Sequence, residues 1–163
     1  MHRSGHLGVA LLVYAPLGAV LLLAGRTEAA VLGEVGMVAL AMAPDYDTRV
    51  PFVKHRGVTH TVWFALVMGA GLGGVGWLLS GRPPVPPASA LVLFGFLVGT
   101  LAGLAHLLAD ALTPMGVRPL WPLSGRTYTL ALSRASNPLA NYALFAVGVL
   151  ATGLVMLALG RLP

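Results

Sequence analysis

Residues 89–112 read SALVLFGFLVGTLAGLAHLLADAL, and this stretch decides the fold class. It is long enough to cross the hydrocarbon core of a bilayer, which takes about 20 apolar residues in a helix. Its apolar residues are continuous rather than alternating, so the run predicts a helix and not a strand of a membrane barrel. Near its end stand His106 and Asp110, which are four residues apart and therefore lie on one helix face.

Four further apolar runs accompany this one. The expected spans, in chain order, are residues 7–25, 29–43, 60–80, 89–112 and 139–160. The chain has 57% hydrophobic and 9% charged residues, and its mean hydropathy is +0.85. These properties predict an all-α, polytopic helical bundle that forms one integral-membrane domain over residues 1–163. A cleaved signal peptide is the alternative for the first run, but no clear small-residue cleavage site follows it.

Local signals mark the ends of the spans. Thr59 is expected to cap the third span. Thr113 precedes Pro114, which disfavours the helical conformation in the residue before it and so ends the fourth span. Asn137 followed by Pro138 is typical of a helix N-terminus and should open the fifth. Between the last two spans, residues 114–136 are too polar to cross and should lie at the membrane surface, as a lid or as an inert connection.

The basic residues predict how the bundle is oriented. If all five spans cross, seven basic residues share one face: Arg3, Arg49, Lys54, Arg56, Arg118, Arg126 and Arg134. Three share the other face: Arg26, Arg82 and Arg161. The positive-inside rule makes the first face cytoplasmic in a multi-pass protein of the cell membrane. Because these residues are spread singly, with no basic run, they indicate topology and anionic lipid headgroups rather than nucleic acid.

The titratable residues gather on that same face. Every histidine and three of the five acidic residues lie at span ends on it: His2, His6, Asp45, Asp47, His55, His60, His106 and Asp110. The chain has no cysteine, which excludes thiolate ligands. Imidazole and carboxylate without sulfur favour Zn²⁺, Mn²⁺, Ni²⁺ or Fe²⁺ over Ca²⁺ and Mg²⁺. We therefore expect a site for one or two divalent transition-metal ions, with zinc foremost.

Roles within this site follow from residue type. The expected metal ligands are His6, Asp45, Asp47, His60, His106 and Asp110. Asp47 or His55 is the candidate general base, and Arg56 is the candidate clamp on a phosphate oxygen. A plainer role stays open for each group: a polar contact between helices for His106 and Asp110, turn capping for the loop aspartates, and solvent or headgroup contact for His55 and Arg56.

These motifs resemble the signature of the YdjM-type family of membrane-bound metal-dependent hydrolases. The matching pieces are His6-Leu-Gly8, Pro44-Asp45-Tyr46-Asp47, residues 55–61 (HRGVTHT), residues 106–116 (HLLADALTPMG) and residues 120–122 (LWP). The resemblance runs from about residue 5 to residue 123, and it implies a hydrolase embedded in the membrane.

The order of the motifs is also similar, more distantly, to the metal sites of zinc phospholipases C and of related multi-zinc nucleases. By that similarity His6, Asp45, His60, His106 and Asp110 are ligands, and Asp45 bridges two ions. No histidine follows His106, so the later ligands of those enzymes have no counterpart here. A full three-zinc site is therefore not expected.

Together these features predict a hydrolase that cleaves a phosphoester or ester of a lipid or lipid-like substrate by a metal-activated water. Its expected partners are membrane lipids and that substrate. Gly95, Gly99 and Gly103 should let another helix approach closely, in this chain or in a second copy, so a homo-oligomer is open. A metal transporter or channel is one alternative, with Glu34 and Asn141 as its only path. A non-catalytic scaffold with a structural metal is another.

Overall fold

The described part of the chain forms five long helices. The computed structural model describes residues 1–80 and 87–160, so Arg82 and Arg161 lie outside the described residues. The helices are α1 (Arg3–Leu23), α2 (Thr27–Leu40), α3 (Val62–Leu79), α4 (Ala88–Ala111) and α5 (Pro138–Leu159). Two 3₁₀ helices, η1 (Ala43–Arg49) and η2 (Val58–His60), stand between α2 and α3. The described residues contain no strand, only one antiparallel bridge between Val117 and Tyr128, so the predicted all-α class is confirmed.

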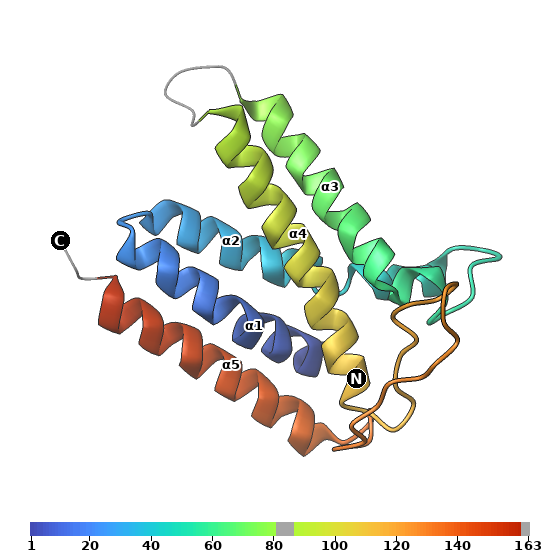
Figure 1. The fold of residues 1–163 in the computed structure, drawn as a ribbon. Coiled ribbons are helices and arrows are strands. Elements are labelled where there is room, and N and C mark those ends of the chain that lie inside the picture. The colour runs from blue at the N-terminus through green and yellow to red at the C-terminus, as the bar shows by residue number, and fades with distance from the viewer. Residues whose placement is uncertain (81–86, 161–163) are drawn as a thin grey trace.

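The helices form two groups that meet at one end. α1 lies between α2 and α5, and α3 and α4 form an antiparallel hairpin that crosses this layer through contacts of α4 with α1 and α2 (Figure 1). The two groups diverge toward the turn between α1 and α2. They come together where α1 begins and α4 ends (Figure 1). This end carries the histidine and aspartate motifs.

Glycines bring α3 and α4 into close contact. A Cβ atom on Gly99 would lie 2.5 Å from the carbonyl oxygen of Met68, and one on Gly95 would lie 2.5 Å from that of Leu72. Side chains at these positions would therefore push the two backbones apart. The expected close approach of another helix to this glycine face is confirmed, and the helix is α3 of the same chain.

Thr61, not Thr59, caps α3. The Thr61 hydroxyl accepts the backbone N–H of Phe64 at 3.3 Å. Thr59 turns instead toward Asp47, to which its hydroxyl donates at 2.6 Å. The prediction for Thr59 was wrong because residues 58–60 form η2 and α3 begins only at Val62, which leaves Thr61 at the N-cap position. The predicted cap of the last helix is confirmed, since Asn137 accepts the N–H three residues further on at 3.2 Å.

The outer surfaces of the helices suit lipid. α5 packs against α1 and exposes large apolar side chains along its length: Leu139, Tyr142, Leu150, Leu154 and Leu157. In the described part of the chain, five helical segments are long and apolar enough to cross a membrane, the second being α2 continued by η1. α2 itself has 14 residues, about 21 Å at the rise of an α-helix.

Candidate metal centre

Five of the predicted metal ligands converge on one buried point. His6 comes from α1, Asp45 from η1, His60 from η2, and His106 and Asp110 from the last two turns of α4. His6, His60, His106 and Asp110 are each 1% exposed. The Asp45 side chain is 25% exposed, so it forms the outer edge of the group. Chain segments 100 residues apart are thus brought together by the meeting of the two helix groups.

Four donor atoms have the spacing of ligands around one ion. His60 Nε2 lies 3.2 Å from His106 Nε2, and Asp45 Oδ1 lies 3.2 and 3.3 Å from these two nitrogens. Asp110 Oδ2 lies 3.5 Å from His60 Nε2 and 3.9 Å from His106 Nε2. Two ligands that each bind zinc at about 2.0–2.1 Å in tetrahedral geometry are about 3.3–3.4 Å apart. The donor atoms of Asp45, His60 and His106 therefore have the spacing of zinc ligands, and Asp110 Oδ2 lies slightly farther from the two nitrogens.

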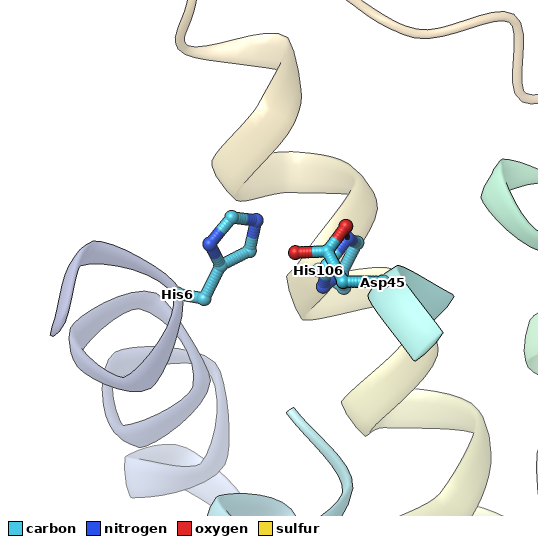
Figure 2. A group of neighbouring side chains, drawn as sticks. All are labelled: His6, Asp45 and His106. Atoms are coloured by element: carbon cyan, nitrogen blue, oxygen red, sulfur yellow. Dashed lines mark ion pairs between the residues drawn. The ribbon is translucent and has the colours of Figure 1, made fainter. Parts of the chain in front are cut away.

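His6 adds a donor on another side of the same group. Its Nε2 lies 3.4 Å from Asp110 Oδ1, and its ring stacks on that of His106 with centroids 4.2 Å apart. Figure 2 shows His6, Asp45 and His106 gathered from three different elements; each offers a donor atom within 4.8 Å of the others. Asp110 thus faces His6 with one oxygen and the other two histidines with its second.

The rings of His6 and His106 are anchored through Nδ1. His6 Nδ1 lies 3.2 Å from the carbonyl oxygen of His2, and His106 Nδ1 lies 2.8 Å from that of Ala41. A carbonyl oxygen can only accept a hydrogen bond, so in both rings Nδ1 carries the hydrogen. The lone pair of Nε2 then points into the site, which is the tautomer that a metal requires.

Asp47 lies behind His60. Its Oδ2 accepts the hydroxyl of Thr59 at 2.6 Å, and this hydroxyl oxygen is 3.0 Å from His60 Nδ1. Its Oδ1 pairs with His55 Nδ1 at 2.8 Å, and Oδ2 also accepts the backbone N–H of Arg56 at 3.3 Å. In this arrangement Asp47 orients the loop and the His60 ring. Direct binding of a metal by Asp47 stays a prediction.

Arg56 holds Asp110. Its Nη2 donates to Asp110 Oδ1 at 2.7 Å, and its Nη1 donates to the carbonyl oxygen of Gly116 at 3.0 Å. The amino group of Met1 also lies 3.0 Å from Asp110 Oδ1. The φ of Arg56 is 58°, in a left-handed region that residues other than glycine seldom adopt. In this structure Arg56 contacts the candidate ligand Asp110. Its predicted role as a clamp on a phosphate oxygen stays a prediction.

The chain as a whole matches the family described as YdjM inner membrane protein, over residues 1–161. It belongs to the YdjM inner membrane protein family. This match confirms the resemblance found in the motifs and agrees with the membrane-spanning helices. Searches of curated proteins and of solved structures gave no match. The more distant similarity to zinc phospholipases C therefore stays a prediction.

Asn141 supports the site of this YdjM-family chain from α5. Its Oδ1 accepts the backbone N–H of His2 at 2.9 Å, and its amide donates to the carbonyl oxygens of Ala135 and Asn137 at 3.0 and 2.6 Å. Since the carbonyl of His2 anchors the His6 ring, Asn141 fixes the first turn of α1 beneath a candidate ligand. The side chain is fully engaged at this end of the bundle.

The polar segment of the YdjM-family chain between α4 and α5 is fastened to the site. Besides the Arg56 contact with Gly116, the backbone N–H of Val62 donates to the carbonyl oxygen of Pro119 at 2.9 Å. Val117 and Tyr128 exchange two backbone hydrogen bonds at 3.0 and 2.8 Å. The bonds of Gly116 and Pro119 tie the segment to the loop that carries His60 and to the start of α3, and so they keep it beside the candidate ligands. The Val117–Tyr128 bonds close the segment on itself.

Proposed function

We propose that this membrane protein is a metal-dependent hydrolase that cleaves a phosphoester or ester bond of a lipid or lipid-like substrate. The observation that supports it most strongly is the 3.2 Å separation of His60 Nε2 and His106 Nε2 inside a shell of carboxylates. With Nδ1 of His106 committed as a donor, its Nε2 presents a lone pair. Lone pairs at this spacing repel each other unless a cation or a proton lies between them.

Two buried atoms add to this argument. Among the described residues, His6 Nε2 and Asp110 Oδ2 have no hydrogen-bond partner. A buried polar atom without a partner costs about 1–3 kcal/mol, and a charged one costs more. Divalent cations would satisfy these atoms, and the donor set of imidazole and carboxylate fits Zn²⁺ first and Mn²⁺, Ni²⁺ or Fe²⁺ next. His60, His106, Asp45 and Asp110 would hold one ion, and His6 with Asp110 would contribute to a second.

The protein side chains supply orientation and proton transfer. An ion bound here would polarise the oxygen of the scissile group and make a water more acidic. The Nδ1 anchors keep the ring lone pairs inward, and Arg56 fixes Asp110. Of the two candidate bases, the side chain of Asp47 is fully buried whereas that of His55 is 47% exposed. We therefore favour His55 as the group that exchanges protons with solvent.

We also propose that the site faces the cytoplasm. The end of the bundle at which the ligands meet is the one that carries seven of the ten basic residues in the sequence. Retention of Lys and Arg on the cytoplasmic side would orient the chain in this way. The substrate would then be a lipid of the cytoplasmic leaflet.

The test is elemental analysis of detergent-purified protein, combined with assays on short-chain phospholipids and phosphodiesters. We expect one or two transition-metal ions per chain in the wild type and loss of metal in Asp45→Ala and His106→Ala. His2→Ala is the matched control, because its exposed ring belongs to the same end of the bundle. Wild type that is metal-free and takes up no added zinc would refute the proposal. Metal binding without any hydrolysis would favour the scaffold with a structural metal.

A further inference from the structure

We propose that the hollow between the start of α1 and the end of α2 binds the phosphate group of a membrane lipid, held by Arg3 and Arg49 beside Asp45. This inference rests on the proposed function, and it names the substrate class and its route to the metal centre. The hollow has a volume of about 390 Å³. Its lining combines a candidate metal ligand, two arginines and the apolar end of a membrane helix.

Asp45 connects this hollow to the metal centre. Its side chain lines the hollow and is 25% exposed, whereas the other candidate ligands are buried. The Oδ1 atom of the same carboxylate lies 3.2 Å from His60 Nε2 and 3.3 Å from His106 Nε2. A group bound in the hollow would therefore lie next to the ligand shell.

Two guanidinium groups are positioned to receive an anion there. Arg3 is the first residue of α1 and Arg49 is the last residue of η1, and both line the hollow. Over residues 1–80 and 87–160, the ion pairs to carboxylates involve neither of them. The Arg49 guanidinium carbon lies 5.1 Å from the centre of the Tyr46 ring, a cation–π contact that holds it at the rim. Guanidinium donors suit phosphate oxygens in geometry and charge.

The apolar wall of the hollow favours a lipid over a soluble phosphoester. It consists of Val38 and Ala39 in the last turn of α2 and of Met42 just after it. Val38 is 39% exposed, and Val35, one turn earlier, is 59% exposed, so the wall continues onto the outward face of α2. In a membrane that face meets acyl chains. A lipid whose chain lies along it would bring its headgroup phosphate to the arginines without leaving the bilayer, whereas a soluble ester would gain nothing from the wall.

A second basic hollow fits this role less well. It has a volume of about 410 Å³ and is lined by Lys54, Arg56, Arg118 and Trp121, among others. Its lining includes none of the five convergent metal donors. The guanidinium of Arg56, moreover, is committed to Asp110 and Gly116. Of the basic residues in this hollow, Arg56 is therefore already neutralised by a candidate ligand.

The test is calorimetric titration of the full-length protein in detergent with dihexanoyl phosphatidic acid. We expect Arg3→Gln and Arg49→Gln each to weaken binding about tenfold, as the loss of one charge-assisted hydrogen bond would. Arg134→Gln, an exposed arginine at the same end but outside the hollow, is the matched control and should bind like the wild type. Inorganic phosphate is the second probe, and it should bind at least tenfold more weakly than the lipid.

Three results would overturn the inference. They are a wild type that does not bind the phosphatidic acid, arginine variants that bind it as tightly as the control, and equal binding of inorganic phosphate. Zinc content and hydrolysis are measured on the same samples, so the two proposals can fail separately. Arginine-dependent binding without metal or hydrolysis would refute only the proposed function. Hydrolysis with arginine-independent binding would refute only this inference.

Discussion

Nη2 of Arg56 lies 2.7 Å from Oδ1 of Asp110, and this ion pair joins the loop before α3 to the end of α4. The same guanidinium also reaches the carbonyl oxygen of Gly116. A lysine ammonium is a point charge and cannot span both partners. We expect Arg56→Lys to lower zinc affinity about 10- to 100-fold while keeping the stoichiometry at saturating zinc. Competition against a chromophoric chelator measures this, with Arg134→Lys as the control.

A different outcome would restore the role predicted from the sequence. If Arg56→Lys binds zinc like the wild type but loses affinity for a phosphate ester, then Arg56 acts on the substrate.

Asp47→Asn and Asp45→Asn should affect metal binding in different ways. The carboxylate of Asp47 contacts the Thr59 hydroxyl and the His55 ring, so its replacement should loosen the orientation of His60. We expect about 10- to 100-fold weaker zinc binding with unchanged stoichiometry. Asp45→Asn replaces a charged carboxylate of the ligand shell itself by a neutral amide, which is a weaker metal ligand, and should reduce the number of bound ions. Elemental analysis after dialysis against excess zinc separates the two, and a lower metal count in Asp47→Asn would make Asp47 a ligand.

Gly99→Ala should destabilise the bundle, whereas Gly71→Ala should not. A Cβ on Gly99 would press on the backbone of Met68 in α3, which cannot move as a flexible side chain can. Overpacking of this kind costs about 1–3 kcal/mol. A Cβ on Gly71, in α3, meets nothing within 4 Å, and alanine is the better helix former by up to about 1 kcal/mol. Thermal unfolding in detergent tests the pair, and equal midpoints would contradict the packing described.

The absence of cysteine from the sequence allows a direct test of orientation. Ser136→Cys places a thiol at the end of the bundle that carries the ligands, and Ala24→Cys places one at the other end; both positions are exposed. With the site in the cytoplasm, a membrane-impermeant maleimide should label Ser136→Cys only in inverted vesicles and Ala24→Cys only in right-side-out vesicles. The reverse pattern would move the site to the outer face.

Much of the fold could be predicted from the sequence. The expected spans 89–112 and 139–160 agree within one residue with α4 and α5, because a proline stands just before each apolar run. The expected span 7–25 begins four residues after the true start of α1 at Arg3, because the first turn contains polar residues that add nothing to a hydropathy signal. Hydrophobic length thus locates the spans, but it does not locate polar helix ends.

The site could be predicted only as a set of residues. Spacing placed His106 and Asp110 on one helix face, and topology placed the other motifs at the same end. Asp47 contacts Nδ1 of His60 through the Thr59 hydroxyl, and not Nε2, the atom that faces the other candidate ligands. Neither spacing nor topology could show this. That distinction depends on how a loop of irregular backbone folds, and local sequence signals do not specify it. The contact of Asn141 with the first turn of α1 depends equally on which helices become neighbours.

The shortness of α2 has a consequence for the surrounding bilayer. The second span reaches a crossing length only with polar η1, because the 14 residues of α2 measure about 21 Å against about 30 Å for the hydrocarbon core. A span that is too short is accommodated by local thinning of the membrane and by flanking arginines that extend to the headgroups. At α2 this hydrophobic mismatch would draw the leaflet surface inward to the level of Asp45. The headgroups of lipids beside the helix would then lie at the same depth as the candidate metal centre.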